Sequence, residues 1–235
     1  LDIPKKGNTN KRNKNELKNE HNIFIANEFF DALPFKQFFK INNKWMERFV
    51  EMNKDNNNKF TKIICNINKV EKELGFKISE NQKVIEYSPL ALKYLKNISK
   101  KIYHKKGCLL IIDYGYLDNL MKDTMMSIRK HKYTNILNTF GNADITYKLN
   151  FKILKKIIKN LKLKCQAITS QRNFLINLGI LQRAEILSKK LPFSKKADIY
   201  YRLKRLIDKD QMGNLFKVML ITDKNINFKT GFEVD

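Results

Sequence analysis

The sequence predicts an α/β protein built on a parallel sheet, and three observations support this. The apolar run at 23–26 stops at a polar cluster, as a buried strand does at its carboxyl end. A second apolar run, 108–112, stops at Asp113. Between them, Ser88 and Pro89 mark the start of a helix. Continuously apolar strands in the order strand, helix, strand indicate a parallel pair joined by a crossover helix.

The crossover helix is amphipathic. Apolar residues recur at helical spacing along one face, with lysines elsewhere: Ala91, Tyr94, Leu95, Ile98 and Ile102. We expect the helix to end between His104 and Gly107, where lysines suit the negative helix end and glycine is a stop signal. The second strand should then run to Asp113 and be followed by a turn at Gly115.

Residues 35–67 predict an antiparallel β insertion. Two aromatic-rich extended runs, 35–41 and 44–50, flank Asn42 and Asn43. Asparagine tolerates the left-handed conformation that a two-residue hairpin turn requires. A third extended run is expected at 60–67, after the asparagine-rich turn that precedes it.

The remaining chain predicts later strands and C-terminal helices. Residues 116–149 show no clear periodicity. Asn150 should cap a helix, and the further elements are strands at 164–169 and 216–222 and helices at 171–178, 181–190 and 195–207. Residues 1–21 are rich in Lys, Asn and Glu and predict a loop or disordered tail. Residues 22–235 are then one domain portion with the insertion at about 35–67.

Composition limits the classes of partner. The net charge is +24, which indicates a polyanion such as nucleic acid or an anionic membrane surface. The lysines are spread along the whole chain, however, so nucleic acid is the less favoured reading and a compositional bias the more favoured one. No apolar run approaches the roughly 18 residues of a membrane span. The isolated Cys and His residues predict free thiols and no metal site.

Carboxylates follow both predicted parallel strands. Glu28 ends the first strand and Asp113 the second, and Asp31 and Asp144 can join them. Because ligands bind beyond the carboxyl ends of parallel strands, we expect a carboxylate-lined mouth with aromatic walls. The walls are expected from Phe29, Phe30 and Tyr114. Such a mouth suits a guanidinium or ammonium group. The alternative is that each acid caps a helix or forms a surface ion pair.

An ordered series of motifs carries a resemblance to a known family. The block Asn27-Glu28-Phe29-Phe30-Asp31-Ala32-Leu33-Pro34 resembles the most specific motif of the MidA family of S-adenosylmethionine-dependent methyltransferases, which includes a mitochondrial complex I assembly factor. Further blocks are similar in the same order over about residues 22–222. They are Trp45 with Glu47-Arg48, Gly107 with 110–115, His131, the segment 141–146, Gln171, 174–175, 178–180, and 212–217.

The resemblance implies a fold and a reaction. The fold is a partial Rossmann-like methyltransferase sheet, with the later strands only. The reaction is methylation of an arginine on a protein substrate, in the family a core subunit of respiratory complex I. Glu28, Asp31 and Asp113 are then the catalytic candidates, since carboxylates can hold a guanidinium for in-line attack. Phe29, Phe30, Tyr114 and Asp144 are substrate-binding candidates, and Asn27 would lie closest to S-adenosylmethionine.

The chain departs from the family in two places. Residues 1–21 hold one glycine, Gly7, and nothing like the family's glycine-rich cofactor loop. Residues 147–151 replace the family's A-H-V-D-F. We therefore expect the activity to need a missing N-terminal half as partner, and the chain alone to bind S-adenosylmethionine poorly. The alternatives are a basic binding module without catalysis and a decayed fragment. The expected location is the bacterial cytoplasm or the mitochondrial matrix.

Overall fold

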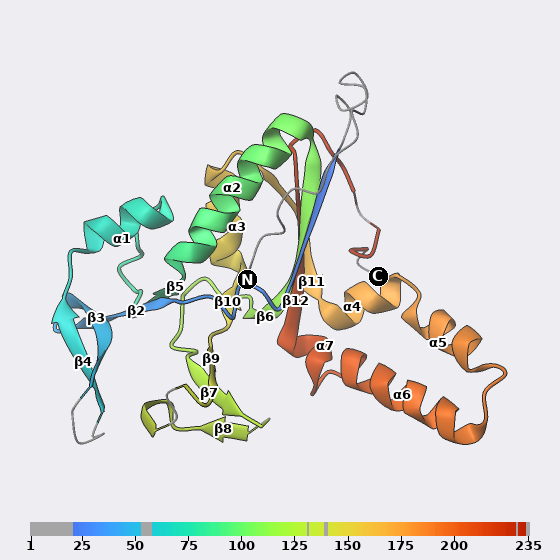
Figure 1. The fold of residues 1–235 in the computed structure, drawn as a ribbon. Coiled ribbons are helices and arrows are strands. Elements are labelled where there is room, and N and C mark those ends of the chain that lie inside the picture. The colour runs from blue at the N-terminus through green and yellow to red at the C-terminus, as the bar shows by residue number, and fades with distance from the viewer. Residues whose placement is uncertain (1–20, 53–57, 131, 139–140, 229, 234–235) are drawn as a thin grey trace, which may run out of the picture.

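A five-stranded sheet forms the centre of the fold (Figure 1). The computed structural model describes residues 21–52, 58–130, 132–138, 141–228 and 230–233. Apart from His21, the tail expected at 1–21 lies outside these residues, and so does His131. The strand order is β1-β6-β12-β11, with β10 beside the end of β6. The bounds are β1 (Asn22–Asn27), β6 (Gly107–Tyr116), β10 (Leu149–Asn150), β11 (Lys164–Ser170) and β12 (Phe216–Thr222).

The predicted parallel pair and its crossover helix are confirmed. Strand β1 runs parallel to β6 from the pair Asn22 and Gly107 to the pair Asn27 and Ile112. Helix α2 (Pro89–Lys105) connects the two strands through the antiparallel insertion and packs on both. Its N-cap is Ser88, whose hydroxyl oxygen accepts a hydrogen bond from the Ala91 N–H at 3.0 Å.

The expected turn at Gly115 is wrong, because β6 continues to Tyr116. The last two residues of β6 pair with β10. A Cβ atom on Gly115 would lie 2.3 Å from the Phe151 ring and 2.6 Å from the Leu149 carbonyl oxygen. The glycine therefore permits close packing inside a longer strand.

The two late strands that were expected form an antiparallel pair. Strand β12 pairs antiparallel with both β6 and β11. Helix α3 (Phe151–Asn160) precedes β11, and the Asn150 side chain caps it by accepting hydrogen bonds from the Lys152 and Ile153 N–H groups. Helices α2 and α3 cover the same face of the sheet (Figure 1). The largest buried core lies between these helices and the sheet.

The insertion forms a separate antiparallel sheet, in the order β4-β3-β2-β5. Its strands are β2 (Lys36–Ile41), β3 (Lys44–Glu51), β4 (Lys59–Ile64) and β5 (Val84–Tyr87). Asn42 and Asn43 have φ of 48° and 60°, which confirms the predicted hairpin turn. The third run ends at Ile64, because Asn66 caps helix α1 (Ile67–Leu74). Neither α1 nor β5 was among the elements predicted from the sequence.

A small sheet fills the segment for which no elements had been predicted. It has the order β8-β7-β9, with β7 (Met126–Arg129), β8 (Lys132–Thr134) and β9 (Asp144–Thr146). A short 3-10 helix, Ile136–Asn138, lies between β8 and β9. Figure 1 shows this sheet below the carboxyl end of β6, so it can contribute to a site there.

Four helices follow or flank the late strands. They are α4 (Gln171–Asn177), α5 (Ile180–Ser188), α6 (Phe193–Ile207) and α7 (Met212–Leu215). Helix α6 begins at Phe193, directly after Pro192, and so two residues earlier than predicted. Helices α5 and α6 project away from the sheet at the lower right of Figure 1.

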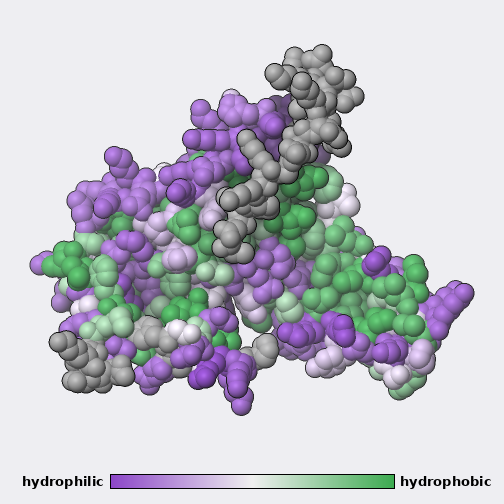
Figure 2. Space-filling model, in the orientation of Figure 1, coloured by the Kyte–Doolittle hydropathy of each residue, from purple (hydrophilic) through white to green (hydrophobic). Residues whose placement is uncertain are grey.

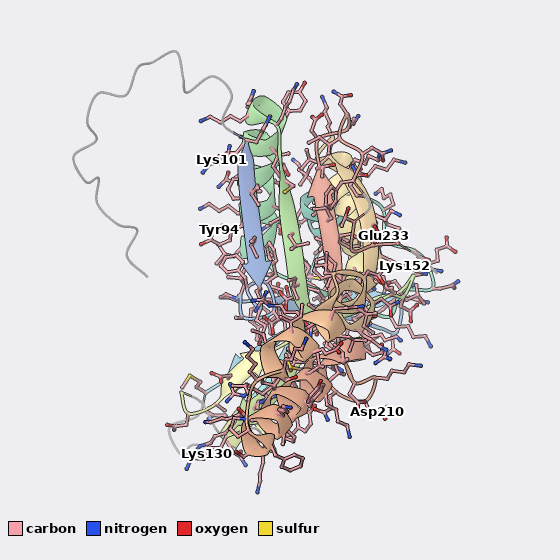
Figure 3. The ribbon with its side chains drawn as sticks, turned by 90° about the vertical axis from the view of Figure 1, so that its right-hand side faces the viewer. Tyr94, Lys101, Lys130, Lys152, Asp210 and Glu233 are labelled. Atoms are coloured by element: carbon pink, nitrogen blue, oxygen red, sulfur yellow. The ribbon has the colours of Figure 1, made fainter. Side chains whose placement is uncertain are left out.

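The described residues cover the second face of the sheet only in part. A cluster that includes Phe174 and Phe232 packs over β12. Ile23 and Ile25 on β1 keep 71% and 69% of their surface exposed. Figure 3 views this face and shows β1 and the upper part of β6 with no described helix in front of them. Among the described helices, none is long and apolar enough to cross a membrane.

Candidate active site

The loop after β1 is fixed to β6 by backbone hydrogen bonds. The Glu28 N–H donates to the Ile112 carbonyl at 2.9 Å, which extends the parallel pairing by one residue. Glu28 then adopts φ of 47°, a left-handed conformation that a non-glycine residue rarely takes. The next two N–H groups, of Phe30 and Asp31, donate to the Asp113 Oδ2 atom at 2.9 and 3.4 Å. Asp113 therefore anchors the turn that carries Glu28 and Asp31.

Asp113 is a buried residue within β6. Its side chain is fully buried, because it follows Leu109 and Ile111 at two-residue spacing on the core face of the strand. Its Oδ1 atom accepts the Tyr114 N–H at 2.9 Å. Burial, and then the negative charge of Asp31, raise the pKa of Asp113 to about 8. Asp113 thus fixes the backbone of the loop from inside the core. The sequence had predicted that Asp113 would instead line the open mouth of the site.

Asp31 lies beside Asp113 and reaches toward β9. It is 7% exposed. The Thr146 hydroxyl donates toward the Asp31 Oδ2 atom at 3.2 Å and the Asp31 carbonyl oxygen at 3.1 Å. Thr146 lies in the motif 141–146 but was not a site candidate, because its contact with Asp31 spans 115 positions in the chain. The small sheet therefore helps to position the candidate acid.

Glu28 and Asn27 are exposed at the carboxyl end of β1. The Asn27 side-chain amide lies 3.5 Å from the Glu28 Oε1 atom. Burial raises the pKa of the half-buried Tyr114, and the negative charges of Glu28 and Asp31 raise it further. Glu28, Asp31 and Tyr114 thus lie close enough to interact electrostatically, and the structure brings these three sequence candidates together.

Two further groups act electrostatically on Tyr114. Tyr133 of β8 raises its pKa, and the Arg205 guanidinium of α6 lowers it. Neither residue was a candidate from the sequence, because both come from elements whose position could be known only from the fold. Charged and titratable groups of β8 and α6 therefore act on Tyr114 together with those of the loop after β1.

The two phenylalanines of the motif lie in different environments. Phe30 is 1% exposed and belongs to the main core, so it does not form the exposed aromatic wall that was expected. Phe29 is 36% exposed and contacts Tyr94 of α2 edge-on, with ring centroids 5.2 Å apart. Phe29 and Tyr114 can serve as aromatic walls. Asp144 is exposed at the start of β9, on the same strand face as Thr146.

A polar network links strands β2, β3 and β5 of the insertion to Asp123, in the segment between β6 and β7. The Arg48 guanidinium donates to Gln37 Oε1 at 2.8 Å and to Asp123 Oδ2 at 3.1 Å. The buried Gln37 amide in turn donates to Asp123 and to Glu86, and burial raises the pKa of the Glu86 carboxyl. A cavity of about 400 Å³ lies next to this network and is lined by residues of the loop and of β3. These include Ala32, Leu33, Pro34, Phe35, Arg48 and Val50.

The residues present fit one side of a site for a charged organic cofactor. Asn27 offers an amide donor and acceptor, and Glu28 an anionic acceptor, at the carboxyl end of a parallel strand where ligands bind in open α/β sheets. On the other side of β1, the exposed Ile23 and Ile25 offer no polar groups. No cluster of described His, Cys, Asp and Glu residues could hold a metal ion.

Two solved structures resemble this chain in fold. A Burkholderia thailandensis protein solved in complex with S-adenosyl-homocysteine superposes with a TM-score of 0.71 at 20% identity, over 92% of this chain and 57% of that one. A second Burkholderia thailandensis structure gives a TM-score of 0.72 at 21% identity, over 92% and 59% of the two chains. At this identity the likeness establishes the fold, and it confirms the expected α/β class.

The family is established by sequence. A model of the family described as "putative S-adenosyl-L-methionine-dependent methyltransferase" matches residues 9–169, which is more than half of the chain. The chain therefore belongs to this family of methyltransferases, and the resemblance drawn from the motifs is confirmed.

Curated relatives carry a more specific name. Protein arginine methyltransferase NDUFAF7, mitochondrial, from Danio rerio is 29% identical over 195 residues, covering 83% of this chain and 46% of the relative. The Xenopus laevis protein of the same name is 28% identical over 86% of this chain and 46% of its own length. The Homo sapiens protein of the same name is 27% identical over 75% of this chain and 39% of its own length. The chain thus spans about half the length of the curated relatives it matches.

Proposed function

We propose that this protein takes part in methylation of an arginine side chain on a protein substrate, with S-adenosylmethionine as methyl donor. The observation that carries the proposal is the loop after β1, where Asp113 accepts two loop N–H groups and sets the positions of Glu28 and Asp31. The family membership and the name of the curated relatives agree with it.

Glu28 and Asp31 hold and orient the substrate guanidinium in this proposal. Two carboxylates can accept its N–H groups and localise its positive charge, which leaves one nitrogen directed at the methyl group. When bound, S-adenosylmethionine supplies an electrophilic methyl group on sulfur. Phe29 and Tyr114 flank the guanidinium with aromatic faces and exclude water.

Asp113 has a positioning role in this proposal. Its raised pKa means that it carries a proton over much of the neutral range, next to Asp31. A protonated Asp113 does not compete with Asp31 as a second negative charge. Asn27 is the residue of this chain that would contact the cofactor.

A further segment completes the cofactor site in this proposal. Strand β1 is paired with β6 on one side, and Ile23 and Ile25 are exposed on its open face. Parallel sheets are normally covered on both faces, so a strand and helix from additional polypeptide would pair with this edge. The substrate expected from the resemblance is a core subunit of complex I, and the location is the mitochondrial matrix or a bacterial cytoplasm.

The test uses protein purified from its native cells through an affinity tag, so that any polypeptide that completes the sheet stays bound. We expect transfer of labelled methyl groups from S-adenosylmethionine to arginine in protein extracts, read by mass spectrometry. Glu28→Gln should lower the rate roughly 100-fold, because it removes a charge that orients the guanidinium. The matched control Glu80→Gln, at an exposed acid on the surface, should keep the parent rate. Absence of methylarginine, or equal rates for the Glu28 variant and the parent, contradicts the proposal.

A further inference from the structure

Helices α5 and α6 form a projecting hairpin. Tyr200 on α6 lies within 3.5 Å of the Ser188 hydroxyl on α5, and the buried Ala184 and Leu203 lie in the hairpin. The hairpin is fixed at its base, where Arg172 donates to the Ile207 carbonyl at 2.7 Å. Residues 186–197, at the other end, are called the hairpin tip here. They lie at the far right of the chain in Figure 1.

The hairpin tip combines exposed apolar side chains with positive charge. Phe193 is 85% exposed, Ile186 74% and Leu187 53%. Within residues 186–197 there are four lysines and no acidic residue. The lysines flank an apolar centre formed by Leu191, Pro192 and Phe193, with Lys189 and Lys190 before it and Lys195 and Lys196 after it. Ile186 and Leu187 lie on α5, before the first lysine pair. None of the four forms an ion pair with an acid in the described part of the chain.

The backbone at the tip satisfies most of its own hydrogen bonds. The Leu191 N–H donates to the Ser188 carbonyl at 3.0 Å. The Lys195 and Lys196 N–H groups both donate to the Pro192 carbonyl at 3.1 Å. Pro192 itself has no N–H to satisfy. The turn can therefore enter an apolar medium without leaving these backbone donors unpaired.

We propose that the hairpin tip binds the surface of a bilayer that contains anionic phospholipid. Phe193, Ile186 and Leu187 would enter the boundary between headgroups and acyl chains, as the apolar residues of interfacial helices do. The four lysines would contact the anionic headgroups, each with a long alkyl chain that can follow the apolar surface. Charge complementarity selects this partner.

The shape of the tip favours a bilayer over a protein partner. The tip is a projection with charge on both sides of an apolar centre, and it matches a deformable, flat anionic surface. A protein would need a pocket for Phe193 rimmed with acids on two sides. Figure 2 shows hydrophobic residues along the hairpin next to hydrophilic ones at its outer end.

Co-sedimentation of the full chain with vesicles tests the proposal. The probes are vesicles of phosphatidylcholine alone and of phosphatidylcholine with phosphatidylglycerol in equal parts. We expect binding to the anionic vesicles and little to the neutral ones. Each lysine near an anionic surface contributes roughly fivefold to binding, so Lys189→Gln with Lys190→Gln should weaken it roughly 25-fold. Phe193→Ser should weaken it roughly tenfold or more, through loss of apolar burial.

Matched variants separate the tip from the general positive charge of the chain. Lys93→Gln with Lys96→Gln removes the same charge from exposed positions on α2, and Phe228→Ser removes an exposed phenylalanine elsewhere. Both controls should bind nearly as the parent does. Phe193→Trp should give blue-shifted emission with anionic vesicles only. Equal losses in the control pair, absence of vesicle binding, or a loss of self-association in Phe193→Ser with unchanged vesicle binding would overturn the proposal.

Discussion

Asp113 is the residue on which the geometry of the candidate site depends. One buried carboxyl accepts three backbone N–H groups, two of them from the loop that carries the candidate acids. Its raised pKa follows from burial and from the charge of Asp31. A carboxyl whose pKa is raised on folding binds its proton more tightly in the folded state. Its contribution to stability is complete below about pH 4, the usual range of an aspartate, and is lost as the pH rises through about 8.

Asp31→Asn should make this pH dependence shallower. The substitution removes the neighbouring charge, so the pKa of Asp113 falls, although burial still holds it above its usual range. Urea unfolding at pH 5 and pH 8 measures the effect as the difference between the two free energies of unfolding. Asp144→Asn, an equal charge change at an exposed acid, should leave the difference at its parent value. A steeper decline in the Asp31 variant would contradict the account.

Several residues of the candidate site could be predicted from the sequence, and others could not. Glu28, Asp31 and Tyr114 were all candidates, since each follows or ends a strongly apolar run. The burial of Asp113 could have been read from its two-residue spacing from Ile111, which continues the core face of β6. The contact between Thr146 and Asp31 could not be predicted from the sequence, because it joins positions that are 115 residues apart. Phe30 was misplaced because its neighbour Phe29 takes the exposed position in the turn.

At the scale of elements, the junction of β6, β10 and α3 is tightly packed. Gly115→Ala should lower the free energy of unfolding by about 1–3 kcal/mol, because the new methyl group meets the Phe151 ring and the Leu149 carbonyl. Urea unfolding measures the loss. The double variant Gly115→Ala with Phe151→Leu should lose less than the sum of the two single variants, since the smaller side chain leaves room. Strict additivity would show that the ring contact is not the cause.

Long elements with strong caps were predictable, and short ones were not. Helix α2 has Ser88 as cap, Pro89 in its first turn and a regular apolar face, and it was found with close to its true bounds. Strand β5 has four residues, and β8 and β9 have three each, which is too short for a periodic pattern to be distinct. Their positions are set by pairing with distant strands.

At the scale of the whole molecule, β1 has exposed apolar side chains and an edge that pairs with no other strand in the described part of the chain. Ile23→Thr with Ile25→Thr should reduce self-association of the isolated chain, because an unpaired apolar edge invites pairing between copies. Threonine keeps the strand preference, so the free energy of unfolding should change by less than about 1 kcal/mol. Sedimentation velocity measures the association. Ile186→Thr, which removes an exposed isoleucine from α5, is the control and should sediment as the parent does.

Because Asp113 of β6 anchors the loop after β1, the loop cannot reach its final geometry until β6 has been synthesised. The hydrogen bonds from Phe30 and Asp31 to Asp113 join positions 83 and 82 apart. At about 5–20 residues per second, the ribosome adds Asp113 about 4–17 s after Phe30. During that interval, the loop has neither its anchor nor the neighbouring strand. The acids therefore take up their positions only after β6 has been made, and a nascent chain that stops before residue 113 contains the whole motif without the geometry of the site.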